Sequence, residues 1–281
     1  MTSLRTAELY AFHHVDRQVF TKMVKDLLRD PGESLLVIAL WLWLERKGYP
    51  KIIVKLASLP DFLVYSAAQE AALCLKCLEN TPPFPISRDG GFLPLTSRVM
   101  ERNLALQFFQ DNKFSAICGI RSMLTNVCSR IFTDILEHHL GNPTQAALNQ
   151  PLLIPGFPHP LYGDLVIVLR PPDHNLPARD PWAWDPMNDV DECDRTVFLT
   201  FSRGFPVSKE EVRELFSEVL GLDCVSDVVM QETPKTSEQC LYAKLVLNSV
   251  ESVDRVLTGR KVAKFQINGK HIWARKYERR D

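Results

Sequence analysis

The sequence is poor in the features on which most enzymes and membrane proteins depend. Glycine accounts for 12 of the 281 residues, and none of these glycines forms a phosphate-binding loop, a dinucleotide fingerprint or a nucleophile elbow. A His-Glu-x-x-His metal motif is also absent. The most apolar run, residues 35–44, is about half the length that a membrane-spanning helix needs. We therefore expect a non-catalytic protein without a cofactor, a bound metal or a membrane segment.

Charge and cysteine content narrow the class of protein further. The net charge is −1, so no bulk field attracts nucleic acid or a membrane surface. The seven cysteines are odd in number and lie dispersed in apolar segments, which favours reduced thiols over a disulfide framework. Cys74 and Cys77 have metal-ligand spacing, but without a second pair we interpret them as core residues of a helix. With no secretory signal at the start, we expect the nucleus or the cytoplasm as the location.

The first half of the chain has the apolar spacing of helices. Asp30 and Pro31 predict a helix start, and the apolar run that follows predicts a helix at the centre of a bundle. Thr96 is a candidate cap for a helix that continues through Phe109. Apolar residues at intervals of three and four predict one long helix over residues 117–135. We expect an all-helical domain over residues 10–141, with a superhelical repeat array as the alternative.

Residues 142–192 differ in composition from the rest. Ten of the 19 prolines lie between residues 143 and 190, a density that opposes regular structure and favours an extended connection. Trp182 and Trp184 are too apolar for a free linker. They are expected to pack on one of the two domains, or alternatively to bind a partner.

The last ninety residues alternate as strands do. Val197 and Leu199 fall on one face of a strand over residues 196–201, while Phe198 and Thr200 fall on the other. A capping box that begins at Ser208 starts a helix, and an Asn-Gly pair at residues 268–269 is a hairpin signal. Further strands are expected at 224–230 and 241–247, and a second helix at 249–257. The order strand, helix, strand, strand, helix, strand predicts an antiparallel sheet with both helices on one face.

This region resembles the RNA recognition motif (RRM) family over residues 195–277. Residues 197–202 match the first signature strand, with Phe198 at the base-stacking position. Residues 240–247 match the second in outline, with Tyr242 at a stacking position and Lys244 where the family prefers another aromatic. The resemblance implies an α+β protein whose residues 193–281 form a ferredoxin-like βαββαβ domain. It also implies single-stranded RNA as the partner.

The charge and alternation of the last strand agree with the resemblance. Between Arg255 and Arg280 there are nine basic residues and one acidic residue. Aromatic rings and cations on one sheet face can stack bases and attract phosphates. The expected nucleic-acid-binding residues are Phe198, Thr200, Tyr242, Lys244, His271, Trp273 and Arg275.

Two alternatives stay open at this point. The proline-rich segment or the helical domain could cover the aromatic residues of the sheet. The domain could also be a protein–protein interaction module without RNA, because the first helix is acidic and residues 259–262 resemble the Arg-x-Phe loop of RRMs that bind a Trp-containing peptide. In that loop Val262 stands where those RRMs have Phe. With either function, the helical domain is expected to bind a protein partner, which would make the chain an adaptor.

Overall fold

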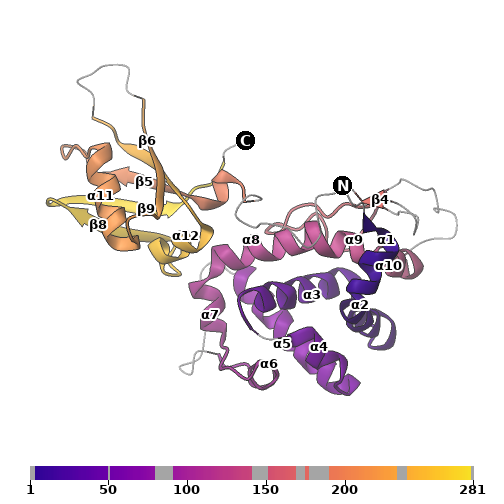
Figure 1. The fold of residues 1–281 in the computed structure, drawn as a ribbon. Helices are drawn as coiled ribbons and strands as arrows, with labels where there is room; N and C mark the ends of the chain where they lie inside the picture. Colours follow the sequence, from indigo (N-terminus) through magenta and orange to yellow (C-terminus); the bar gives the residue numbers. More distant parts are fainter. Residues whose placement is uncertain are drawn as a thin grey trace. The chain divides into compact units, whose positions relative to one another are not determined.

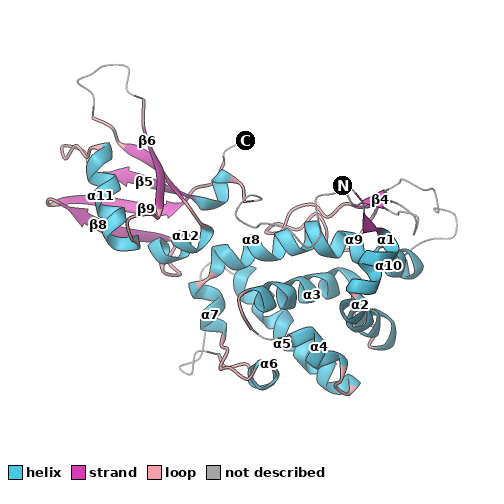
Figure 2. Cartoon of the chain, viewed as in Figure 1, coloured by secondary structure: helices cyan, strands magenta, loops and turns pink. Residues whose placement is uncertain are grey.

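The protein is described from a computed structural model that covers residues 4–49, 51–79, 91–140, 151–168, 175–176, 190–232 and 239–279. It contains helices and antiparallel sheets, as expected for the α+β class (Figures 1 and 2). The chain divides into two compact units. One comprises Met1–Phe109 and Gly119–Pro186, and the other comprises Gln110–Cys118 and Met187–Asp281. Trp182 and Trp184 lie outside the described residues.

Helix α3 (Pro31–Arg46) is the most buried element of the helical unit. The Asp30 side chain caps it by accepting a 2.8 Å hydrogen bond from the Glu33 N–H, with Pro31 at the first helical position. Nearly the whole run from Leu35 to Leu44 is buried, because α3 packs against α5 (Asp61–Glu79) and other helices. The sequence prediction of a capped, central helix is confirmed.

Short helices and strands complete this unit. Two turns of π-helix, Lys22–Asp26 and Leu124–Cys128, continue α2 and α8. Two pairs of two-residue strands, β1 with β4 and β2 with β3, run antiparallel. The remaining bounds are α1 (Thr6–Phe12), α2 (His14–Thr21), α4 (Ile52–Ala57), α6 (Pro94–Met100), α7 (Leu106–Asp111), α8 (Lys113–Met123), α9 (Ser129–Ile131), α10 (Thr133–Leu140), β1 (Leu4–Arg5), β2 (Pro151–Leu152), β3 (Ile167–Val168) and β4 (Asn175–Leu176).

The prediction that Thr96 caps a helix through Phe109 is wrong. Helix α6 begins at Pro94, so Thr96 lies inside it and donates its N–H and its hydroxyl to the Glu70 carboxylate. The helix ends at Met100, because Glu101 adopts a left-handed conformation with φ of 55°. The first turn of α6 is thus capped by Glu70 of α5, a partner that the local sequence does not reveal.

The long helix expected over residues 117–135 is also interrupted. After the π-helical turn, Phe132 leaves helical geometry and α10 begins at Thr133. The break is stabilised from α2, where Arg17 donates to the Ile131 carbonyl and forms an ion pair with Asp134 at 2.7 Å. The apolar spacing correctly indicates helix on both sides of the break. At the break, the Ile131 carbonyl accepts from Arg17 and is not available to accept from the N–H of a continuing helix.

The second unit is built on a five-stranded antiparallel sheet. Its strands are β5 (Thr196–Phe201), β6 (Val225–Met230), β7 (Tyr242–Leu247), β8 (Val262–Ile267) and β9 (Lys270–Lys276), in the order β6-β7-β5-β9-β8. Helices α11 (Lys209–Leu220) and α12 (Val250–Leu257) lie over one face (Figure 1). Their apolar residues form one buried core with the inward residues of the strands.

Local sequence signals define the ends of several elements in this unit. Ser208 and Glu211 form the expected capping box of α11. Asn268 and Gly269 take φ angles of 48° and 76°, which is the geometry of a two-residue hairpin turn between β8 and β9. A short 3-10 helix, η3 (Glu192–Arg195), precedes β5.

Residues Gln110–Cys118 belong to the sheet unit rather than to the helical domain in which the sequence placed them. The Asp254 carboxylate of α12 accepts hydrogen bonds from the N–H groups of Phe114 at 2.8 Å and Ser115 at 2.9 Å, at the start of α8. The Phe114 side chain packs against the core beneath the sheet. These contacts join residues about 140 positions apart, so local patterns could not predict them.

Candidate nucleic-acid interface

The sheet face opposite α11 and α12 carries all seven residues predicted for the site. On β5, Val197 and Leu199 are fully buried, while Phe198 and Thr200 are half-exposed. On β9, Ile272 and Ala274 are fully buried, and the residues that alternate with them point the other way. Tyr242 is 39% exposed at the start of β7. We call this surface the open face of the sheet.

The strand register brings six of these residues into two adjacent rows. In one row Phe198 pairs with Lys244 of β7 on one side and with Arg275 of β9 on the other. In the next row Thr200 pairs with Tyr242 and Trp273 in the same way. Neighbouring strands lie about 4.8 Å apart, so each row is compact enough for its side chains to touch.

His271 lies apart from these rows. It pairs with Gln266 near the hairpin turn, and its ring centroid is 6.0 Å from that of Trp273. Its Nδ1 atom is buried and has no hydrogen-bond partner within the described residues. Because His271 lies between Trp273 and the hairpin turn, its ring extends the aromatic surface toward the hairpin.

Ring–ring and ring–cation contacts connect the two rows. The rings of Phe198 and Tyr242 stack with a centroid separation of 5.3 Å and an interplanar angle of 25°. The guanidinium of Arg275 lies 4.6 Å from the Phe198 centroid. The ammonium of Lys244 lies 4.8 Å from the ring of Tyr277, the residue after β9.

Sequence reasoning missed Tyr277 and Lys264, which belong to the same face. Lys264 of β8 pairs with Trp273, and its ammonium lies 5.8 Å from that ring. The alternation that turns Trp273 and Arg275 outward also turns Tyr277 outward. The two-residue turn fixes the pairing of β8 with β9, so the position of Lys264 was available from the sequence.

Lys270 and Lys276, two of the nine basic residues between Arg255 and Arg280, bind groups away from the open face. Lys276 donates to the Cys193 carbonyl, and Lys270 binds the Glu211 carboxylate of α11 at 2.7 Å. The Lys270 bond, together with the Ser208 N–H and the Asn268 side chain, lowers the pKa of Glu211 to about 2. Both lysines stabilise the domain instead of widening the open face.

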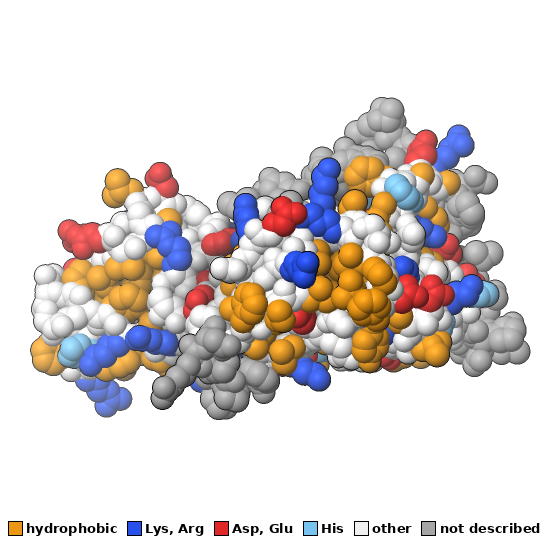
Figure 3. All heavy atoms as spheres, turned by 90° about the horizontal axis from the view of Figure 1, so that it is seen from below, with side chains coloured by type: hydrophobic (Ala, Val, Ile, Leu, Met, Phe, Trp, Pro, Cys, Tyr) orange, Lys and Arg blue, Asp and Glu red, His pale blue; other side chains and the backbone are white. Residues whose placement is uncertain are grey.

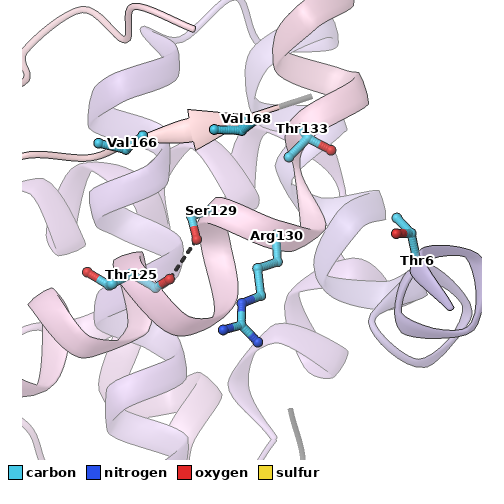
Figure 4. Close-up of a pocket in the computed structure, with 7 residues that line it drawn as sticks. All are labelled: Thr6, Thr125, Ser129, Arg130, Thr133, Val166 and Val168. Atoms are coloured by element: carbon cyan, nitrogen blue, oxygen red, sulfur yellow. Dashed lines mark hydrogen bonds between the residues drawn. The ribbon is translucent and has the colours of Figure 1, made fainter. Parts of the chain in front are cut away.

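A pocket in the helical unit lies between β3 and the helices that precede α10. It has a volume of about 180 Å³. Three hydroxyl-bearing residues line it, from the π-helical turn Leu124–Cys128, from α9 and from α10, together with Thr6, Arg130 and two valines (Figure 4). Ser129 donates to the Thr125 carbonyl, Thr133 bonds the hydroxyl of Tyr10, and the Arg130 side chain points away from the strand in this view. The polar groups are therefore engaged within the fold or do not converge on one point.

Other kinds of site find little support in the described part of the chain. No cluster of three or more His, Cys, Asp or Glu side chains there could hold a metal ion. None of its helices is both long and apolar enough to cross a membrane. Cys74 and Cys77 are buried core residues of α5, and burial raises the pKa of the Cys74 thiol.

Comparison with known proteins adds no relative to these observations. No family model, no curated protein and no solved structure matches the chain.

Proposed function

We propose that the sheet unit is an RRM-like domain that binds single-stranded RNA on its open face. One observation carries this proposal: Phe198, Tyr242 and Trp273 lie on the face that the helices leave uncovered, with three cations beside them. Aromatic rings provide stacking surfaces for unpaired bases, and cations attract the phosphates that connect those bases.

The element order agrees with this proposal. Strand, helix, strand, strand, helix and a final hairpin produce a sheet in which β5 and β7, the two strands with family signatures, are adjacent. Phe198 and Tyr242 then contact each other across these strands. A duplex presents its bases stacked and paired, so the open face suits a single strand better.

Substitution of both stacking residues is expected to abolish most of the affinity. Each stacked base contributes roughly 1–3 kcal/mol, so the Phe198→Ala, Tyr242→Ala double variant should bind at least about 30-fold more weakly than the wild type. The affinity of the full chain for single-stranded RNA of random sequence, measured by fluorescence anisotropy at two salt concentrations, checks this.

Phe205→Ala provides the matched control, because Phe205 is an exposed aromatic in the turn after β5. It should bind as the wild type does. No binding by the wild type at low salt would rule out the RNA proposal. Equal affinity of the double variant and the wild type would leave RNA binding possible but contradict stacking on these rings.

The protein-only alternative has less support in this unit. Glu211, one of the four acidic residues of α11, is held by Lys270, Asn268 and Ser208, so its carboxylate is not available to a peptide. Val262 lies on the open face opposite Arg275, and it lacks the ring that the peptide-binding loop requires. A Trp-containing peptide that competes with RNA for the chain would favour this alternative.

The protein partner expected for the helical unit stays a prediction. Figure 3 shows hydrophobic side chains gathered on one surface of this unit. Phe62 of α5 is 67% exposed, and Leu28 is 81% exposed with a left-handed backbone. Arg29, which follows Leu28, lies over the ring of Tyr65 one turn after Phe62. These residues are the first ones to substitute when a partner is sought.

A further inference from the structure

Every cation on the two central rows of the open face rests on an aromatic ring. Arg275 lies over Phe198, Lys244 lies over Tyr277, and Lys264, at the edge strand, lies over Trp273. Each distance to the ring centroid is within the roughly 6 Å at which a cation is attracted to a ring. Three such pairs on one face indicate a common arrangement rather than a single chance contact.

Phe198 shows the consequence most clearly. Tyr242 stacks on it from β7, and Arg275 covers it from β9, the strand on the opposite side of β5. The ring is therefore in contact on both sides. A base cannot stack on the side that the guanidinium occupies until Arg275 leaves.

We infer that nucleic acid binds to this face by exchange, in which a base takes the place of Arg275 on Phe198 and the released guanidinium pairs with a phosphate of the same strand. The inference rests on the RNA-binding function proposed above and defines its ligand more closely. The ligand must carry bases and phosphates together, because a neutral base would displace the cation without offering it an anion. Lys264 and Trp273 form the second site of the same exchange.

The exchange has two opposing effects on affinity that differ in their dependence on salt. Release of Arg275 from the ring costs free energy at every salt concentration, because the attraction of a cation to a ring at short range is little screened. Its pairing with phosphate contributes most at low salt, since each phosphate contact adds about 0.7 to the salt slope for single strands. Removing the cation should therefore weaken binding at low salt and strengthen it at high salt.

The test compares wild-type full chain with Arg275→Gln, using single-stranded RNA of random sequence at about 0.05 M and about 0.5 M salt. The loss of one phosphate contact changes the ratio of the variant's affinity to the wild-type affinity about fivefold between these two salt concentrations. We expect the variant to bind about twofold more weakly at the lower salt and about two- to threefold more tightly at the higher salt.

Lys264→Gln repeats the test at Trp273, and it is the safer variant for folding because Lys264 is exposed. Lys261→Gln is the control, an exposed lysine before β8. Its affinity should fall at low salt and approach the wild-type value at high salt without crossing it. The unfolding midpoint of each variant shows whether the fold is retained.

The outcomes separate the inference from the function on which it rests. The exchange is supported if Arg275→Gln and Lys264→Gln both bind RNA more weakly than the wild type at the lower salt and more tightly at the higher salt. Variants that bind more weakly than, or equally to, the wild type at both salt concentrations overturn the exchange and leave RNA binding intact. Failure of the wild type to bind at either salt concentration overturns the proposed function, and the exchange with it.

Discussion

Gly119→Ala is expected to destabilise the helical unit, although alanine is normally the better helix former. A Cβ atom at this position of α8 would lie 2.0 Å from Cδ1 and 2.4 Å from Nε1 of Trp43. The indole is 2% exposed and has Phe108 and Phe109 beside it, so it has little room to move. Overpacking of a closed core typically costs about 1–3 kcal/mol, and occasionally more. The gain in helix propensity offsets only about 0.5–1 kcal/mol of that cost.

Urea unfolding followed by circular dichroism measures the effect as a lower midpoint. A second variant identifies the cause: Trp43→Phe provides space at the contact, so Gly119→Ala should cost less in that background than in the wild type. The Trp43→Phe substitution alone is expected to be destabilising because it leaves a cavity. A Gly119→Ala protein as stable as the wild type would show that α8 and α3 can separate slightly without loss.

Asp254→Ala is expected to destabilise the sheet unit strongly. The substitution leaves the part-buried N–H of Phe114 and the buried N–H of Ser115 without their acceptor. An unsatisfied buried polar group costs roughly 1–3 kcal/mol, so two of them place the expected loss at about 2–6 kcal/mol. Differential scanning calorimetry of the full chain would detect it as a lower midpoint for the sheet unit.

The same carboxyl group makes stability depend on pH in a direction unusual for an aspartate. Burial raises the pKa of Asp254 to about 6, although its two N–H partners favour the charged form. In the unfolded chain the pKa is about 3.9, so between these two values the folded state binds more protons. Its stabilising contribution is fully present below about pH 4 and is lost as the pH rises through about 6. The difference amounts to about 3 kcal/mol.

Asp254→Asn isolates this contribution, because asparagine keeps the shape and one acceptor but does not titrate. The free energy of unfolding of the wild type should fall by more than that of the variant between pH ~5 and pH ~7. Parallel pH profiles for the two proteins would contradict the assigned pKa. A smaller stability of Asp254→Asn at pH ~5 is expected in any case, since the amide NH2 replaces one of the two oxygens that accept from these N–H groups.

The sheet could be predicted from the sequence because its determinants are local. Alternation places Phe198 and Trp273 on the open face, and the Asn-Gly turn fixes how β8 pairs with β9. The same reasoning would have included Lys264 and Tyr277. What the pattern could not give is the contact of each cation with a ring, because a strand pattern defines the face of a side chain and not its rotamer.

The errors in the helical half share one physical cause. The hydroxyl of Thr96 predicts a cap, yet the acceptor that caps the helix is Glu70 of α5. The helix over residues 117–135 breaks where Arg17, more than a hundred residues earlier, takes its carbonyl. Side chains from distant helices override local propensity at both places, and a single sequence does not reveal such partners.

The inclusion of Gln110–Cys118 in the sheet unit means that the chain passes from one unit to the other three times. A single cut therefore cannot yield two intact fragments, and a fragment that begins near Met187 would lack Phe114 and both N–H partners of Asp254. During synthesis this segment leaves the ribosome well before α12 exists. Folding from the N-terminus, as most multidomain chains fold, must leave the first turn of α8 incomplete until α12 has been synthesised.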